Sequence, residues 1–233
     1  MLTTLDFDFD SGTLLYKGRN EVRRFDAHGQ SIVVKRFRHR PLLLRIVESI
    51  FRKSKARRAY ENALHIEEHG FSTPHPLGYV ENRRCAVVGT TYYICCHTDS
   101  EAIRHRLIEH EPFDRQLATA YARFVARLHQ AGVLHRDLNP TNVLFKASAD
   151  GNYSFELIDT NRMRFYDGPV PKKQCMENLT LFWWLTPVYR YVLEEYARQR
   201  QWTPDDIDEA IRVKQRHDRR WVLRKRITHP LRK

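Results

Sequence analysis

The chain has 233 residues, of which 42% are hydrophobic and 12% aromatic, and this composition predicts a globular protein with one large domain or two small lobes. No apolar run reaches the roughly 18 residues of a membrane-spanning helix, and the acidic N-terminus lacks a signal-peptide pattern. We therefore expect a cytoplasmic protein whose four cysteines stay reduced.

The net charge of +12 is unevenly placed along the chain. Residues 36–58 hold nine Lys or Arg against one acid, and residues 212–233 hold ten against one. Such clustering favours an anionic partner, and a solvated surface without a dedicated partner is the alternative.

The first 100 residues are dominated by predicted strands. Pro41 opens a basic amphipathic helix over residues 41–52, and Ser54 caps a second helix that ends at Gly70. β-Branched runs and turn residues predict strands at residues 13–16, 21–26, 32–37, about 84–88 and 91–96.

The remainder is mainly helical. Asp114 can cap a helix that ends at Gly132, and Asp150-Gly151 marks a hairpin between strands at residues 143–145 and 153–158. Further helices are expected at about residues 174–201 and from Pro204 onward. The predicted fold is α+β and two-lobed: residues 1–100 form an N-lobe with an antiparallel sheet and a helix, and residues 101–233 form a mostly helical C-lobe.

The central motif reads His135-Arg136-Asp137 and is followed by Asn142, and the predicted hairpin then ends at Asp159. Antiparallel pairing brings the two ends of a hairpin together, so the Asn142 amide oxygen and the Asp159 carboxylate are expected to meet as ligands of Mg²⁺. Asp137 is placed to accept the proton of an acceptor hydroxyl, with His135 and Arg136 on the same catalytic loop. The spacing predicts ATP-dependent phosphoryl transfer, and the alternative is an ordinary turn with a surface Arg136–Asp137 pair.

A lysine on the predicted third strand is the candidate for holding the α- and β-phosphates of ATP. Lys35 occupies that place, and Glu61 on the following helix is its expected partner. Glu61 could instead pair with Arg57 or His65 along its own helix.

The glycine-rich loop expected of a kinase is degenerate, since only Gly18 is present and Val22 follows it. Gly18 could let backbone amides approach phosphate, and Val22 could cover the adenine. An ordinary hairpin turn is the alternative.

These motifs resemble the protein-kinase-like superfamily and, within it, the Kdo/WaaP family of bacterial lipopolysaccharide kinases, over roughly residues 15–200. The resemblance implies a protein-kinase-like fold, Asp137 as catalytic base, Asn142 and Asp159 as metal ligands, Lys35 as an ATP contact, and a Kdo or heptose hydroxyl of the inner core as acceptor. The segments that carry it are Val33-Val34-Lys35-Arg36-Phe37, Ser54-Lys55-Ala56, Tyr60-Glu61-Asn62-Ala63, Gly70-Phe71-Ser72-Thr73-Pro74-His75-Pro76, His135-Arg136-Asp137-Leu138-Asn139-Pro140-Thr141-Asn142 and Leu157-Ile158-Asp159-Thr160-Asn161-Arg162.

The sequence departs from protein kinases where D-F-G is expected, because Asp159-Thr160-Asn161 lacks the phenylalanine. Asn161 is expected to adopt the left-handed backbone of the missing glycine. Only 74 residues (233 − 159) follow Asp159, which favours a small-molecule or glycolipid acceptor over a protein.

The partners expected from this resemblance are ATP, Mg²⁺ and the lipopolysaccharide inner-core glycolipid, with no nucleic acid. The basic segments 36–58 and 212–233 are expected to dock on the inner face of the inner membrane. Trp183 and Trp184 are expected in the C-lobe core. Two alternatives stay open: a protein-kinase-like phosphotransferase acting on a protein or another small molecule, and a non-catalytic basic binding module.

Overall fold

The computed structural model describes residues 8–27, 29–37, 53–84 and 87–228. The predicted helix at residues 41–52 lies outside these ranges. The chain forms two compact units: unit 1 comprises Met1–Asp99 and Asp159–Arg162, and unit 2 comprises Ser100–Ile158 and Met163–Lys233.

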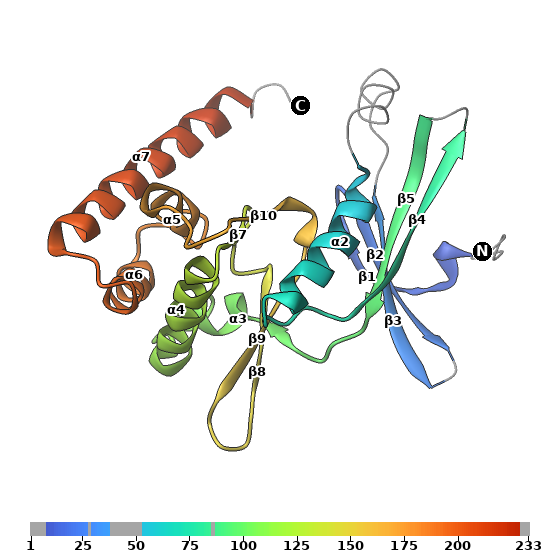
Figure 1. Cartoon of the computed structure of the whole chain (residues 1–233), viewed down its shortest axis with the longest axis horizontal. Coiled ribbons are helices and arrows are strands. Elements are labelled where there is room, and N and C mark those ends of the chain that lie inside the picture. The colour runs from blue at the N-terminus through green and yellow to red at the C-terminus, as the bar shows by residue number, and fades with distance from the viewer. Residues whose placement is uncertain (1–7, 28, 38–52, 85–86, 229–233) are drawn as a thin grey trace. The chain divides into compact units, whose positions relative to one another are not determined.

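Unit 1 is built on a five-stranded antiparallel sheet (Figure 1). Val22 on the second strand stands opposite Lys35 on the third, so both side chains project from the same face. The strands, in the spatial order β1-β2-β3-β5-β4, are β1 (Thr13–Lys17), β2 (Glu21–Ala27), β3 (Gln30–Phe37), β5 (Val87–Cys96) and β4 (Pro76–Arg84).

The last two strands form one long hairpin, so the predicted start near residue 84 was wrong. The first of them already begins at Pro76. Proline lacks a backbone donor and is tolerated there because β4 is an edge strand and Pro76 is its first residue.

Helix α2 (Lys55–Glu68) begins as predicted, because the Ser54 hydroxyl accepts a hydrogen bond from the Arg57 amide. Its small residues let the helix backbone lie close to the sheet. The resulting core contains Phe37, Ala56, Ala59, Ala63, Tyr93 and Cys95.

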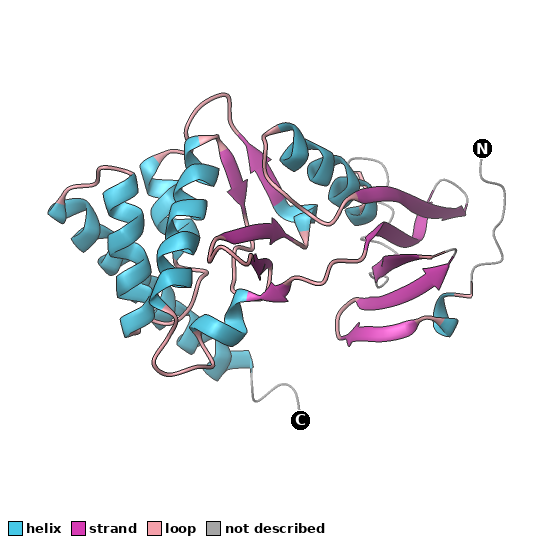
Figure 2. Ribbon diagram, turned by 90° about the horizontal axis from the view of Figure 1, so that it is seen from below, coloured by secondary structure: helices cyan, strands magenta, loops and turns pink. Residues whose placement is uncertain are grey.

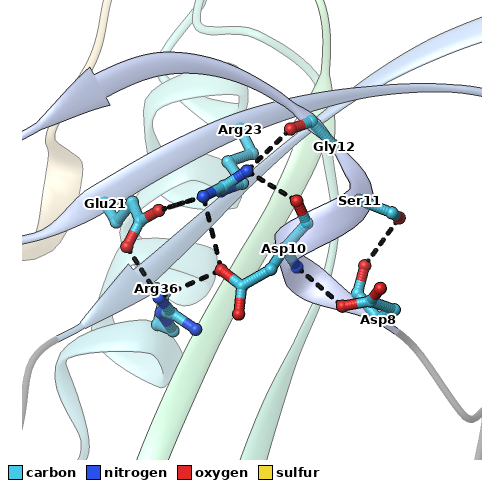
Figure 3. A network of polar contacts seen from close by, with 7 residues as sticks. All are labelled: Asp8, Asp10, Ser11, Gly12, Glu21, Arg23 and Arg36. Carbon is cyan, nitrogen blue, oxygen red and sulfur yellow. Dashed lines mark hydrogen bonds and ion pairs between the residues drawn. The ribbon is translucent and has the colours of Figure 1, made fainter.

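The opposite side of the sheet carries a short 3-10 helix, η1 (Phe9–Ser11), fixed by the polar network in Figure 3. Phe9 is 4% exposed and packs against Tyr92, with ring centroids 5.6 Å apart. The Arg36 guanidinium lies 4.2 Å from the Phe9 ring centroid and 2.6 Å from the Glu21 carboxylate, which also binds Arg23 at 2.7 Å. The network joins η1 to the inner strands.

Unit 2 packs helices against short strands, and its longer helices lie side by side in Figure 2. Asp114 caps α4 by accepting from the Leu117 amide at 2.9 Å, as predicted. Tyr121 of α4 stacks on Phe182 at 5.1 Å. The elements are β6 (Glu101–Ala102), α3 (Ile103–Leu107), α4 (Arg115–Gln130), β7 (Val133–His135), β8 (Val143–Ala147), β9 (Tyr153–Leu157), β10 (Met163–Phe165), α5 (Lys172–Leu179), α6 (Pro187–Gln199) and α7 (Pro204–Thr228), with η2 (Thr160–Arg162) belonging to unit 1.

The helix predicted at residues 174–201 is two helices, α5 and α6, separated by a loop. Pro187 is the first residue of α6, a position where its missing N–H costs nothing. In the intervening loop Phe182 is buried but Trp184 is 37% exposed, so the expectation that Trp184 lies in the core was wrong.

Within the described chain, no helix is both long and apolar enough to span a membrane. Among the described residues, Cys95, Cys96 and Cys175 form no disulfide with one another.

Candidate active site

The loop between β7 and β8 in unit 2 carries the His-Arg-Asp motif. The Asp137 carbonyl accepts a hydrogen bond from Asn142 Nδ2 at 2.8 Å, and the Asp137 carboxylate accepts one from Asn139 Nδ2 at 3.3 Å. Asn139 also accepts from the Thr141 amide at 2.9 Å. These local bonds close the loop on itself and fix the direction of the Asp137 side chain. Arg136 is exposed.

His135 is buried, and its ring forms hydrogen bonds to two backbone segments. Its Nδ1 accepts from the Asp137 amide at 3.1 Å, and its Nε2 lies 2.9 Å from the Ile158 carbonyl. A carbonyl can only accept, so Nε2 carries the proton, Nδ1 carries the lone pair and the ring is uncharged. This bonding fits a positioning role better than proton transfer.

Asn142 lies at the start of the predicted hairpin, which forms with the expected pairing of β8 and β9. The Ile158 amide donates to the Asn142 carbonyl at 3.0 Å, so the two ends of the hairpin meet. Since Asn142 Nδ2 donates to Asp137, the Oδ1 atom is the one left for a cation.

In unit 1, Lys35 Nζ lies 2.5 Å from Asp159 Oδ1, and both side chains are largely buried. Asn161 Nδ2 donates to the same oxygen. Asp159 has a φ of 58°, in the left-handed region that residues other than glycine rarely adopt. The left-handed residue is therefore Asp159 and not Asn161, which corrects the expectation from the sequence.

Helix α2 holds this strained segment through two hydrogen bonds that sequence reasoning missed. Asn62 Nδ2 donates to the Thr160 carbonyl at 2.7 Å, and Thr160 Oγ1 donates to the Ala59 carbonyl at 2.8 Å. Thr160 is 2% exposed. The only sequence signal was the position of Asn62 directly after Glu61.

The expected Lys35–Glu61 ion pair is not formed among the described residues. Glu61 instead bonds Arg57 and Lys53, each at 2.8 Å. These partners hold the pKa of Glu61 below its usual value although burial opposes the shift. Glu61 therefore forms the alternative pair with Arg57 on its own helix. Such an i, i+4 contact forms within one helix and does not depend on how other elements pack.

The degenerate glycine loop is a tight turn between β1 and β2. The Gly18 amide donates to the Asn20 carbonyl at 3.0 Å. A side chain on Gly18 would meet the outer end of the Tyr16 ring, which is exposed and would have to turn aside. Val22 is half-buried and faces the same side of the sheet as Lys35.

The donor sets fit a nucleotide and a hard cation. Lys35 in unit 1 carries an ammonium group of the kind that binds phosphate. The Asp159 carboxylate in unit 1 and the Asn142 amide in unit 2 each carry an oxygen of the kind that Mg²⁺ takes alongside water and phosphate. In the part of the chain that the structure describes, no group of three His, Cys, Asp or Glu side chains forms a metal cage. Mg²⁺ held by few protein oxygens together with phosphates needs no such cage.

The chain resembles known proteins both in sequence and in structure. Residues 100–213, just under half of the chain, match the model of the lipopolysaccharide kinase (Kdo/WaaP) family. The structure is similar to that of WaaP in complex with acyl carrier protein, with a TM-score of 0.63 and 19% identity over 90% of this chain and 88% of that chain. No curated protein matches the sequence. The WaaP likeness confirms the predicted α+β fold, with an antiparallel N-terminal sheet and a helical C-terminal part.

Proposed function

Because the family model and the WaaP likeness support membership of this chain in the lipopolysaccharide kinase (Kdo/WaaP) family, we propose that it transfers phosphate from ATP to a Kdo or heptose hydroxyl of the lipopolysaccharide inner core. The family assignment supports a phosphotransferase that acts on lipopolysaccharide. The observation that carries the finer proposal is the Asp137 loop, where the Asp137 carboxylate accepts a hydrogen bond from Asn139 and the Asp137 carbonyl accepts one from Asn142.

In this proposal Asp137 is the catalytic base. Its carboxylate orients the acceptor hydroxyl and receives its proton as the oxygen attacks phosphorus. His135 and Arg136 support the same loop.

Lys35, Asn142 and Asp159 are the proposed nucleotide and metal residues. Lys35 would exchange its bond to Asp159 for oxygens of the α- and β-phosphates, which leaves Asp159 with Asn142 for Mg²⁺. Bound Mg-ATP supplies the transferred phosphoryl group and the charge that offsets its negative oxygens. Gly18 and Val22 would cover the nucleotide, and Glu61 would have to leave Arg57 before it could support Lys35.

The test is transfer of labelled phosphate from Mg-ATP to inner-core oligosaccharides ending in Kdo or heptose. Asp137→Asn should lower the rate on the order of 10³-fold, because general-base catalysis contributes roughly that much. Asp208→Asn is the matched control, because Asp208 is an exposed carboxylate of α7. Unchanged transfer by Asp137→Asn would contradict the mechanism, and ATP turnover that labels only a protein would contradict the acceptor.

We also propose that the chain works on the inner face of the inner membrane, where the C-terminal half of α7 docks on anionic lipid. Trp221 and Leu223 of that helix are 38% and 57% exposed. Trp221 packs against the exposed Trp184, with ring centroids 4.7 Å apart, and Lys225 Nζ lies 4.0 Å from the Trp221 ring centroid. Exposed aromatic rings among basic side chains suit an anionic interface.

A further inference from the structure

A line of buried hydrogen bonds in unit 2 ends on the backbone of the His-Arg-Asp loop. Asn178 of α5 donates through Nδ2 to the His135 carbonyl at 2.9 Å. Its Oδ1 lies 3.1 Å from Nε2 of His129 on α4, and Nδ1 of His129 lies 2.8 Å from the hydroxyl of Tyr196 on α6. All four residues are at most 5% exposed.

The direction of every bond in this line is determined by its last acceptor. The His135 carbonyl can only accept, so Asn178 turns its amide nitrogen toward it and its oxygen toward His129. His129 must then carry its proton on Nε2 and accept at Nδ1 from the Tyr196 hydroxyl. Three helices are thereby joined in one donor-to-acceptor sequence that runs from Tyr196 to the loop.

Burial keeps this sequence in a single protonation state. It lowers the pKa of His129 to about 4 and raises the pKa of Tyr196 above its usual range. His129 is therefore neutral and Tyr196 protonated throughout the pH range in which a cytoplasmic enzyme works. Hence the donor and acceptor roles along these hydrogen bonds stay the same near neutral pH.

We propose that Asn178, His129 and Tyr196 are positioning residues for the reaction assigned to Asp137. The His135 carbonyl that Asn178 binds belongs to the His135–Arg136 peptide, one peptide before that of Asp137, and the His135 ring accepts from the Asp137 amide at 3.1 Å. The backbone before Asp137 is thus held on both sides. This inference rests on the proposed role of Asp137 as base.

The size of the expected effect follows from geometry. Misplacing a catalytic group by about 1 Å costs roughly 10²-fold in rate, so losing the Asn178 bond should act on kcat. The nucleotide contacts assigned to Lys35 lie in unit 1 and are not part of this line, so KM for ATP should stay within about threefold of its normal value.

Asn178→Asp is the diagnostic substitution because it keeps the shape of the side chain and replaces the Nδ2 donor by a carboxyl oxygen that can titrate. Ionised, the new carboxylate repels the His135 carbonyl; protonated, it donates to that carbonyl and still accepts from His129. Burial raises the pKa of such a carboxyl by up to about 3–5 units, which brings its titration near neutral pH. The kcat of the variant relative to the unaltered protein should be about 10- to 100-fold low at about pH 8 and recover toward one as the pH falls to about 5.5.

Gln130→Glu is the matched control. It makes the same change of an amide to an acid on α4, but Gln130 is exposed and its Oε1 accepts from Arg200, as a carboxylate would. Its kcat ratio should be flat with pH. Tyr196→Phe should lower kcat several-fold with no recovery at low pH, because no acid has been introduced.

A second measurement separates this inference from the proposed function. Hydrogen exchange of the amides in residues 135–142 should be faster in Asn178→Asp than in the unaltered protein at about pH 8, after correction for the intrinsic rate, and equal at about pH 5.5. A kcat ratio or an exchange ratio that does not change with pH would overturn the positioning role. Inactivity of the unaltered protein would instead overturn the proposed function, and the exchange data would still decide this inference.

Discussion

At the scale of single residues, the segment after β9 shows how unit 1 keeps a residue with a strained backbone in place. Asp159 has a φ of 58°, a conformation that costs a non-glycine residue on the order of 1–3 kcal/mol. The next residue, Thr160, is held at its carbonyl by Asn62 and at its hydroxyl by Ala59. The bond from Lys35 then fixes the carboxylate itself.

We predict that Asn62→Leu lowers kcat for phosphate transfer about tenfold and destabilises the protein by about 1–2 kcal/mol. The substitution removes the hydrogen-bond donor of the buried Thr160 carbonyl. The segment that carries Asp159 thereby loses one of its hydrogen bonds to α2. Steady-state kinetics and chemical denaturation measure the two effects.

Glu61→Gln, at the preceding position, is the comparison for this experiment. It should have the smaller effect on kcat, because Glu61 bonds Arg57 and Lys53 and not Lys35. A larger loss in Glu61→Gln than in Asn62→Leu would show that the Lys35–Glu61 pair expected from the sequence forms during turnover.

The sequence identified Lys35 and the Asp137 loop as candidates because their motifs have fixed spacing, but it gave the wrong partner for Lys35. Lys35 and Asp159 are 124 residues apart, and the Asn62–Thr160 contact spans 98. Contacts of this kind leave no local pattern. Glu61, in contrast, has a cation four residues before it, and this local competitor is the one it binds.

At the scale of elements, α7 is anchored at its middle and exposed toward its end. Lys214 is 1% exposed, and its Nζ donates to the Thr180 carbonyl at 3.0 Å and to Asp218 at 2.7 Å. Burial lowers the pKa of Lys214 although Asp218 opposes the shift. Beyond this anchor come Trp221 and Leu223, exposed among basic residues.

We predict that the protein floats with vesicles containing anionic lipid at low salt and that Trp221→Ser combined with Leu223→Ser lowers the bound fraction about tenfold. The two substitutions remove the apolar contacts and leave the charge intact. Leu77→Ser is the control, because Leu77 is 46% exposed, between the values of Trp221 and Leu223, but lies on β4 of unit 1. Equal flotation of both variants would contradict docking through α7.

Element boundaries were predictable where caps and turns mark them. Ser54 and Asp114 cap their helices as expected, and Gly151, with a φ of 79°, forms the hairpin turn. Two boundaries were missed. Pro187 opens α6 inside the stretch predicted as helical at residues 174–201, and β4 begins at Pro76, before the strand start predicted near residue 84.

At the scale of the whole molecule, protonation links stability to pH in two stages. Burial lowers the pKa of His129 to about 4 from an ordinary value of 6.5. Several carboxylates have pKa values below the usual range because cations or hydrogen-bond donors hold their ionised forms. Hydrogen bonds from Arg36 and Arg23 lower the pKa of Glu21. Hydrogen bonds from Lys172 and Thr203 lower the pKa of Asp206.

We predict that the free energy of unfolding falls by about 3 kcal/mol between about pH 6.5 and pH 4 because of His129. Between these values the unfolded chain binds a proton that the folded chain excludes, so stability rises with pH there and is level above it. Below about pH 4.5 the carboxylates add a further loss, since their folded pKa values lie under their unfolded ones.

Denaturant titrations at a series of pH values measure this dependence, and His129→Gln should flatten the upper stage while leaving the lower one. An unchanged slope between about pH 6.5 and pH 4 in that variant would show that another group is responsible.

The division of unit 1 into two separate stretches of chain has a consequence for biosynthesis. Residues Asp159–Arg162 belong with Met1–Asp99 although the intervening chain forms unit 2. During translation α2 therefore emerges long before Thr160, the partner of Asn62 and of the Ala59 carbonyl, has been made. Unit 1 is incomplete on the ribosome until residue 162 has left the exit tunnel. A nascent chain stalled before that point should be cleaved by protease in α2, and one stalled well after it should be protected.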